Sequence, residues 1–205
     1  MKLFYSPGAC SLAPHIVARE AGLRLDLERV DLGSGKTEGG ATFADLNPKG
    51  YVPALSLDNG EVLTEVSALV QYLGDQAVQT GLVPAAGTIE RYRLLEWLGF
   101  IATEIHKGFG PLWNPQAPEA MKTIAKNNLA KRFAYIDQRL AGGPYLTGDR
   151  FTVADAYLFT VTNWTNYHGI DLKPYPNLKA YMERVGARPR VRDALAAEGL
   201  LKEAA

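Results

Sequence analysis

Residues 47–67 read NPKGYVPALSLDNGEVLTEVS, and most of the predicted architecture follows from this run. Pro53 stands at the entrance of a short apolar segment, where a proline is tolerated because the first residue of a strand need not donate a hydrogen bond. Asn59-Gly60 lies between apolar positions and predicts a two-residue turn, since both residues accept a positive φ. The run therefore predicts two short antiparallel strands. The residues alone favour a trans Val52-Pro53 bond, because only about 5% of X–Pro bonds in folded proteins are cis.

A helix is expected directly after the second strand. Apolar side chains recur at helical spacing over Ala68–Leu73. Glu65, Val66 and Ser67 then lie at the N-terminus of this helix. Unpaired N–H groups and the helix dipole make such an end suitable for a small anion or a carboxylate.

The composition indicates a chain with ample core and no charge bias. Its 205 residues suffice for one large domain or two small ones, and 22 Lys and Arg balance 22 Asp and Glu. Nothing in this balance favours nucleic acid, an anionic membrane or an acidic partner. Cys10 is the only cysteine, which excludes an intrachain disulfide, and three scattered histidines do not indicate a metal site. The single cysteine leads us to expect the reducing cytoplasm. No run reaches the length of a membrane span.

The first residues predict a strand followed by a helix. Lys2–Tyr5 is the strand, and apolar positions from Leu12 onward form one face of the helix. Cys10 and Ser11 then lie at the helix start, where the dipole favours a thiolate. A lone cysteine is otherwise usually a small buried hydrophobic side chain, and both interpretations stay open. The order strand, helix, strand implies a right-handed crossover between two parallel strands.

The segment 33–37, GSGKT, is only superficially similar to a phosphate-binding loop. That motif requires a glycine five positions before its Gly-Lys pair, where this chain has Val30. The segment therefore does not indicate an NTPase. Lys36 is most simply a solvated lysine in a glycine-rich loop, and contact with a ligand carboxylate is the alternative.

The second part of the chain is dominated by long helical patterns. Residues 80–87, TGLVPAAG, form the predicted linker between domains at 1–79 and 88–205. The predicted helices are Glu90–Lys107, one that begins at Pro118 and ends before Gly142, Val153–Tyr167, Asn177–Arg188 and Pro189–Leu201. Thr152 and Asp155 approximate a capping box and are therefore structural.

His106 lies at the C-terminal end of the first of these helices, beside Lys107. A histidine there often serves only as a favourable cation for the helix dipole. In a functional role it would lie over a ligand as a hydrogen-bond donor or proton carrier. The residues alone leave both roles open.

Taken together, these motifs resemble the beta class of bacterial glutathione transferases, the cysteine-containing group. The resemblance covers essentially the whole chain, and its parts are specific by their joint order and spacing. Those parts are MKLFY (1–5) with PGACSL (7–12), NPKG (47–50) with VPAL (52–55), LTE (63–65), EW (96–97), IATE (101–104) with HKGF (106–109), FTVADAYLF (151–159) and RP (188–189).

The resemblance implies an α/β plus all-α fold, in which a thioredoxin-like N-terminal domain precedes an all-helical C-terminal bundle. It also implies a homodimer and a cis Val52-Pro53 bond. In the implied glutathione site, the Val52 backbone beside Pro53 pairs with the cysteinyl part. Glu65 and the Val66 N–H hold the γ-glutamyl end, and Lys36 approaches the glycyl carboxylate.

The resemblance also assigns roles around the sulfur of glutathione. Cys10 faces the sulfur, with His106 and Lys107 nearby, and the candidate donors to the sulfur are Ser11, Tyr5 and His106. Two further positions complete the implied site. Glu104 matches an acid that the dimer partner contributes. Val66 stands where many relatives have a serine, and Ser67 follows it, so the backbone contact is kept and the hydroxyl contact stays open.

The implied activity joins the glutathione thiolate to an electrophilic carbon of a largely apolar substrate, with glutathione as co-substrate and no metal. Because Cys10 could form a mixed disulfide with glutathione, the alternative enzymes are a glutathione-dependent thiol-disulfide oxidoreductase and a reductive dehalogenase. A third interpretation is a non-catalytic carrier of apolar ligands.

Overall fold

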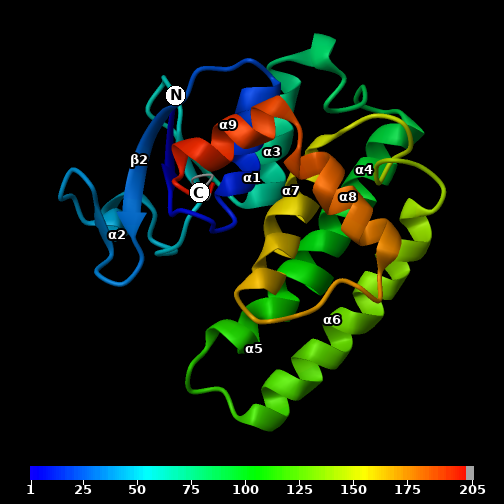
Figure 1. Cartoon of the computed structure of the whole chain (residues 1–205). Coiled ribbons are helices and arrows are strands. Elements are labelled where there is room, and N and C mark those ends of the chain that lie inside the picture. Colours follow the sequence, from blue (N-terminus) through cyan, green and yellow to red (C-terminus); the bar gives the residue numbers. More distant parts are fainter. Residues whose placement is uncertain (202–205) are drawn as a thin grey trace. The chain divides into compact units, whose positions relative to one another are not determined.

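The protein is described here by a computed structural model of residues 1–201 (Figure 1). Its elements group into two compact units, which are described separately. The first contains residues 1–83 and the segment that begins at Ala187, and the second contains residues 84–186. Within residues 1–201 we find no helix with the length and hydropathy that a membrane crossing requires.

The first unit is built on a five-stranded sheet with the strand order β3-β2-β1-β4-β5. Its strands are β1 (Lys2–Tyr5), β2 (Asp26–Asp31), β3 (Lys36–Thr37), β4 (Ala54–Ser56) and β5 (Val62–Thr64). As predicted, β1 and β2 are parallel and β4 and β5 form an antiparallel hairpin, while β1 pairs antiparallel with β4. The sheet is therefore mixed, as expected for a thioredoxin-like domain.

The described part of the first unit contains five helical segments. They are α1 (Leu12–Glu20), α2 (Phe43–Leu46), α3 (Val66–Asp75), η1 (Val78–Thr80) and α9 (Pro189–Ala197). Leu12, Ile16 and Val17 of α1 are buried, and α1 contacts both α3 and α9 (Figure 1). The compact units thus differ from the predicted domain ranges at α9, because this helix packs with the first unit and not with the helical bundle.

The connection between β4 and β5 differs from the prediction. The Leu57 N–H bonds to the Glu61 carbonyl at 2.8 Å, and the Gly60 N–H bonds to the Leu57 carbonyl at 3.0 Å. Residues 58–60 therefore form a three-residue loop in which Gly60, with φ 87°, has the left-handed conformation and Asn59 does not. The predicted two-residue turn is wrong, because a type I turn followed by a left-handed glycine also joins two strands.

The Val52–Pro53 bond lies at the start of β4 and is cis. The expectation from the resemblance is confirmed, and the trans bond favoured by the residues alone is wrong. Glu65, Val66 and Ser67 lie at the start of α3, as predicted.

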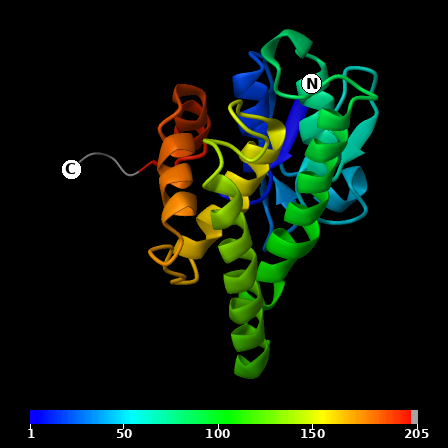
Figure 2. The same ribbon diagram turned by 90° about the vertical axis from the view of Figure 1, so that its right-hand side faces the viewer.

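The second unit is helical. Its elements are α4 (Ile89–Phe100), η2 (Ile101–His106), η3 (Lys107–Phe109), α5 (Gly110–Trp113), α6 (Glu119–Leu140), α7 (Val153–Thr162), η4 (Asn163–Asn166) and α8 (Pro176–Gly186). Every residue of α7 is buried, and α7 lies between α4 and α8 (Figure 2). The predicted helices are therefore present, and the π-helix η2 that extends α4 was not predicted.

The predicted capping box at the start of α7 is confirmed. One oxygen of the Asp155 carboxyl group accepts the Thr152 N–H at 2.8 Å and the Thr152 hydroxyl at 2.9 Å. The other accepts the Leu146 N–H at 3.0 Å and the Tyr181 hydroxyl at 3.2 Å. Burial nevertheless raises the pKa of Asp155 to about 6, although these four donors lower it. Asp155 thus joins the start of α7 to α8 and to the preceding loop.

Asp155 should make the free energy of unfolding depend on pH. Its pKa is about 6 in the folded protein, above the usual 3.8, so the folded state binds the proton more tightly. The resulting stabilisation is fully present below the pKa that Asp155 has in the unfolded chain. It is lost as the pH rises through the pKa that Asp155 has in the folded protein. Between about pH 5 and about pH 7.5, the free energy of unfolding of the wild type should fall by about 1–2 kcal/mol relative to that of Asp155→Asn, as measured by urea unfolding. A stability difference between the two proteins that does not change with pH would contradict this.

Candidate functional site

The loop between β1 and α1 carries Cys10. This residue immediately precedes Ser11, the N-cap of α1, so its predicted place at the helix start is confirmed. Cys10 is partly buried, and its Sγ lies 3.3 Å from the carbonyl oxygen of Val52. Only a protonated thiol can donate to a carbonyl. This contact therefore favours the thiol and opposes the helix N-terminus, which favours the thiolate.

Ser11 and Tyr5 lie on either side of this loop. The Ser11 hydroxyl is buried; it accepts the Ser6 N–H at 3.1 Å and donates to the Ser6 carbonyl at 3.2 Å. Its hydrogen is thus engaged in closing the loop. Burial and the negative charge of Glu198 raise the pKa of Tyr5. The Tyr5 phenol therefore keeps its proton at neutral pH and remains a hydrogen-bond donor.

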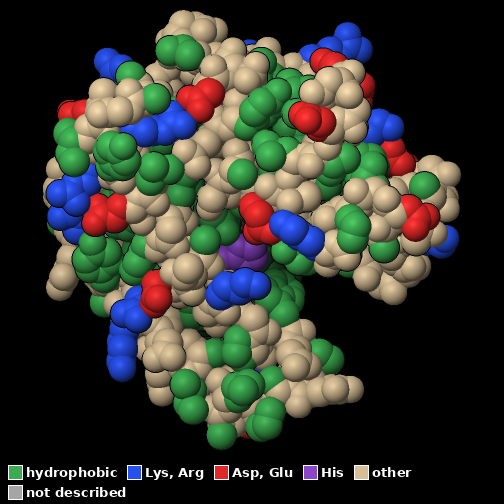
Figure 3. Space-filling model, turned by 180° about the vertical axis from the view of Figure 1, so that it is seen from behind, with side chains coloured by type: hydrophobic (Ala, Val, Ile, Leu, Met, Phe, Trp, Pro, Cys, Tyr) green, Lys and Arg blue, Asp and Glu red, His purple; other side chains and the backbone are tan. Residues whose placement is uncertain are grey.

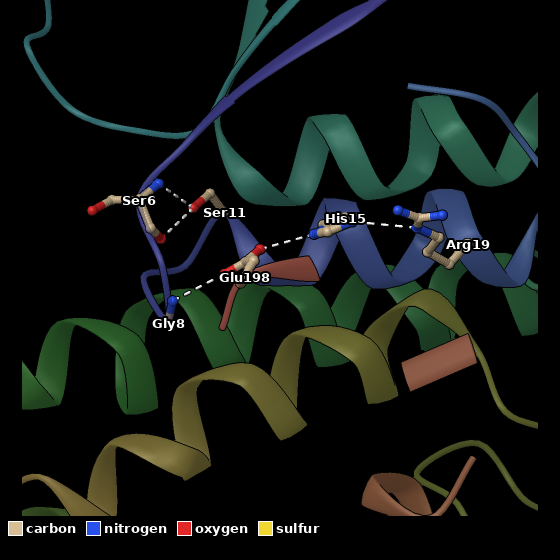
Figure 4. A network of polar contacts seen from close by, with 6 residues as sticks. All are labelled: Ser6, Gly8, Ser11, His15, Arg19 and Glu198. Carbon is tan, nitrogen blue, oxygen red and sulfur yellow. Dashed lines mark hydrogen bonds and ion pairs between the residues drawn. The ribbon is translucent and has the colours of Figure 1, made fainter. Parts of the chain in front are cut away.

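A buried carboxylate attaches the Cys10 loop to two helices (Figure 4). Glu198, directly after α9, accepts the Gly8 N–H at 2.9 Å and contacts His15 Nδ1 at 2.9 Å. The His15 and Glu198 side chains are 1% and 0% exposed. Arg19 Nε donates to His15 Nε2 at 3.3 Å, so the ring nitrogens of His15 are bonded on both sides. This cluster was not predicted, because His15 and Glu198 lie 183 residues apart and no local motif links them.

Removing the Glu198 carboxylate should destabilise the first unit. Glu198→Ala leaves the Gly8 N–H and His15 without this buried partner, which costs about 3 kcal/mol of unfolding free energy. Chemical denaturation measures the loss. Asp193→Ala is the matched control, since Asp193 is also on α9 but pairs with Arg190 at the surface, where ion pairs contribute little. Equal stability of the two variants would contradict a structural role for the buried carboxylate.

Glu65 is held in an unusual conformation at the N-cap of α3. Its φ is 70°, the one positive value at a non-glycine residue within residues 1–201. With φ 70° and ψ 123°, Glu65 lies in a sparsely populated backbone region, which costs on the order of 1–3 kcal/mol for an L-residue. Strain of this kind concentrates at functional sites and persists only where the surroundings enforce it. The N–H groups of Val66 and Ser67 belong to the first helical turn, whose donors have no partner within a helix.

The Glu65 carboxylate binds an ammonium group in this structure. Its Oε1 accepts from Lys49 Nζ at 2.6 Å and from the Tyr51 hydroxyl at 2.9 Å. These hydrogen bonds raise the pKa of both Lys49 and Tyr51. Lys49 also donates to Thr64 Oγ1 at 2.9 Å. Lys49 and Tyr51 were not predicted as site residues, although they lie in the run of residues 47–55 that carries part of the resemblance.

Lys36 lies apart from Glu65 within the first unit. It is on β3, at one edge of the sheet, whereas α3 follows β5 at the other edge. The Lys36 ammonium donates to Thr42 Oγ1 at 2.7 Å. The structure therefore brings Glu65, Val66 and Ser67 together at one helix end and does not place Lys36 beside them.

The remaining predicted site residues belong to the second unit. His106 ends the π-helix η2, and its Nδ1 lies 2.6 Å from the Tyr157 hydroxyl oxygen. Glu104, on the same helix, pairs with Arg132 of α6 at 2.6 Å, so its carboxylate is bound within its own chain. Lys107 is exposed. Single π turns inside α-helices are frequent at functional sites.

The distribution of charge agrees with the composition. Figure 3 shows basic, acidic and hydrophobic side chains interspersed on one face of the molecule. Among residues 1–201, no group of three or more His, Cys, Asp or Glu side chains could hold a metal ion.

Comparison with known proteins identifies the family. Residues 8–76 match the family described as glutathione S-transferase, N-terminal domain, and residues 100–189 match glutathione S-transferase, C-terminal domain. Over 200 residues the chain is 47% identical to the glutathione S-transferase GstA of Escherichia coli O157:H7, covering 98% of this chain and 100% of that protein. The chain belongs to the glutathione S-transferase family.

Solved structures extend this result to the class and the fold. A sphingomonad glutathione S-transferase complexed with glutathione is 48% identical, with a TM-score of 0.95 and coverage of 98% of this chain and 100% of that one. The beta-class glutathione S-transferase of Sphingomonas chungbukensis is 47% identical, again with a TM-score of 0.95 and the same coverage. The beta-class resemblance and the thioredoxin-like plus all-helical fold are confirmed.

Proposed function

We propose that this protein is a glutathione S-transferase that joins the thiolate of glutathione to an electrophilic carbon of apolar substrates. The observation that carries the proposal is Glu65, a strained N-cap residue whose carboxylate accepts an ammonium group from Lys49 at 2.6 Å. The γ-glutamyl end of glutathione carries the same group. Glutathione S-transferase GstA of Escherichia coli shares 47% of this sequence, and the sphingomonad relative was solved with glutathione.

In this proposal, glutathione is held at two places, the N-terminus of α3 and the backbone of Val52. Glu65 binds the γ-glutamyl ammonium, and the N–H groups of Val66 and Ser67 bind its carboxylate, where the helix dipole adds to the attraction. The Val52 carbonyl, which accepts the Cys10 thiol hydrogen, receives the cysteinyl N–H. Contacts at both positions fix the sulfur, which makes its reaction with a bound electrophile effectively intramolecular.

Hydrogen-bond donors around the sulfur favour the thiolate of glutathione over the thiol. The proposed donors are Tyr5, whose phenol stays protonated because burial raises its pKa, and His106. Cys10 faces the sulfur, and its thiol hydrogen is donated to the Val52 carbonyl. Ser11 contributes by holding the loop, because its hydroxyl donates to Ser6. The thiolate then attacks the electrophilic carbon, a carbon–sulfur bond forms, and the leaving group departs with the bonding electrons.

We further propose a homodimer that acts in the cytoplasm. The first turns of α4 expose Ile89, Tyr92 and Leu95, whose side chains are 64%, 58% and 37% exposed. An apolar helix face of this kind is suited to a second copy of the chain. The single cysteine agrees with a reducing compartment.

The Glu65 proposal is tested by conjugation of an aryl halide. The wild type should convert glutathione and the halide to a thioether. Glu65→Gln should raise the KM for glutathione about tenfold or more, because a neutral amide replaces a charge-assisted bond to the ligand ammonium. Glu61→Gln, an exposed acid in the neighbouring hairpin loop, should leave the KM unchanged. A wild type without thioether product would contradict the proposed function, and equal KM values would contradict the assignment of Glu65.

The place of Cys10 is tested with oxidised glutathione. In the exchange, the Cys10 thiolate attacks one sulfur of the disulfide, a Cys10–glutathione bond forms, and the second glutathione leaves as a thiolate. The wild type should gain the mass of one glutathione per chain, detected by mass spectrometry, and Cys10→Ser should gain none. Because Cys10 is the only cysteine, the variant serves as the blank, and a wild type that gains no such mass would contradict the place of Cys10 at the sulfur.

A further inference from the structure

The contact between His106 and Tyr157 has the geometry of a hydroxyl donor. The Tyr157 oxygen and His106 Nδ1 are 2.6 Å apart. Bonds that an N–H donates to oxygen span about 2.7–3.2 Å, so 2.6 Å is short for a bond donated by Nδ1, whereas hydroxyl donors make shorter bonds, about 2.5–3.0 Å to oxygen. The distance therefore fits Tyr157 as the donor and Nδ1 as the acceptor. Since a neutral imidazole carries one hydrogen, that hydrogen is then on Nε2.

Two aromatic rings fix the plane of the His106 ring. The Tyr157 ring meets the imidazole edge to face, at 89° and 5.8 Å between centroids. The Trp164 ring does the same at 74° and 4.9 Å. Tyr157 and Trp164 are only 2% and 5% exposed, so neither ring is free to turn away. His106 thus has both its hydrogen-bonding partner and its orientation defined within the second unit.

The backbone on both sides of the contact is also fixed. Tyr157 lies on α7, directly after the capping box in which Asp155 binds Thr152 and the Tyr181 hydroxyl. On the other side, the π turn closes with a hydrogen bond from the Lys107 N–H to the Ala102 carbonyl, five residues back. Each of the two elements thus has hydrogen bonds of its own, α7 also packs against η2, and the hydrogen bond between Tyr157 and His106 adds to that contact.

From this geometry we propose that Tyr157 is a positioning residue that holds His106 in the Nε2–H tautomer. The proposal rests on the proposed function, in which His106 stabilises the sulfur of glutathione. In this tautomer, the N–H at Nε2 has a fixed direction and can donate a hydrogen bond to a thiolate. Nε2 then has no lone pair that would repel the sulfur. Tyr157 itself touches neither glutathione nor the electrophile in this scheme and acts only through His106.

The tautomer is measured by two-bond ¹H–¹⁵N correlation spectra of protein labelled with ¹⁵N-histidine. The chain has three histidines, and the signals missing in His106→Asn assign His106. In the wild type His106 should be the Nε2–H tautomer. Tyr157→Phe removes the hydroxyl and should give a mixture of tautomers. Tyr135→Phe is the control, because it removes a tyrosine hydroxyl of the same unit at an exposed position of α6 and should leave the His106 signals unchanged.

Kinetics connect the tautomer to the reaction. Tyr157→Phe should lower kcat for aryl halide conjugation about tenfold, the effect of one lost hydrogen bond to a functional group, while the KM for glutathione changes less than about twofold. In a His106→Asn background, Tyr157→Phe should have no further effect on kcat, because the residue acts only through His106.

Three results would overturn the positioning role of Tyr157. They leave the proposed function intact, because that function is tested by thioether formation in the wild type. They are an Nδ1–H tautomer in the wild type, unchanged His106 signals in Tyr157→Phe, and an equal loss of kcat with and without His106. A changed tautomer with an unchanged kcat would overturn it as well. Failure of the proposed function appears separately, as a wild type that forms no thioether.

Discussion

The first unit depends on the buried carboxylate of Glu198. An ionised carboxylate without partners is costly to remove from water, and the penalty is offset only when hydrogen bonds satisfy both oxygens. Here the partners are the Gly8 N–H and His15, at 2.9 Å each. The loop that carries Cys10, the helix α1 and the end of α9 must therefore be in place together. The position of the thiol at the start of α1 is a consequence of a contact near the C-terminal end of the chain.

A second constraint acts at the start of α3. Glu65 is held at φ 70°, and Lys49 and Tyr51 bind one oxygen of its carboxylate. The bonds hold the acid at the helix N-terminus, beside the first-turn N–H groups of Val66 and Ser67. An acid next to free N–H donors is complementary to a ligand group that carries an ammonium and a carboxylate on one carbon. A γ-glutamyl end has this chemistry, which supports the proposed role of Glu65.

Much of this arrangement could be predicted from the sequence, because it follows from local patterns. Alternating and helical apolar spacing located the β4–β5 hairpin, α1 and the helices of the second unit. The Thr152 and Asp155 pair is a short-range motif, and its predicted role is confirmed. The Asn59-Gly60 pair was less informative, because the same residues fit a two-residue and a three-residue loop. The resemblance supplied the cis Val52–Pro53 bond, which the residues alone did not favour.

What could not be predicted depends on long-range contacts. His15 had no partner in the sequence, since Glu198 reaches it only once α9 packs against α1. The π turn that ends at His106 has no distinctive composition, and the bond to Tyr157 spans 51 residues. Lys36, which its local sequence describes only as a lysine in a glycine-rich loop, lies on β3 at the sheet edge opposite β5, and the strand order decides that position. In each case the pairing is decided by tertiary packing, which residue spacing does not encode.

The most direct test of the account is a calorimetric titration of the protein with reduced glutathione and, separately, with cysteinylglycine, which lacks the γ-glutamyl group. The account predicts saturable binding of glutathione near one site per chain. It also predicts binding at least about tenfold weaker for the dipeptide, because the dipeptide cannot use the charge-assisted bonds to Glu65 and the start of α3. Equal affinity for the two ligands, or no saturable binding of glutathione, would contradict it.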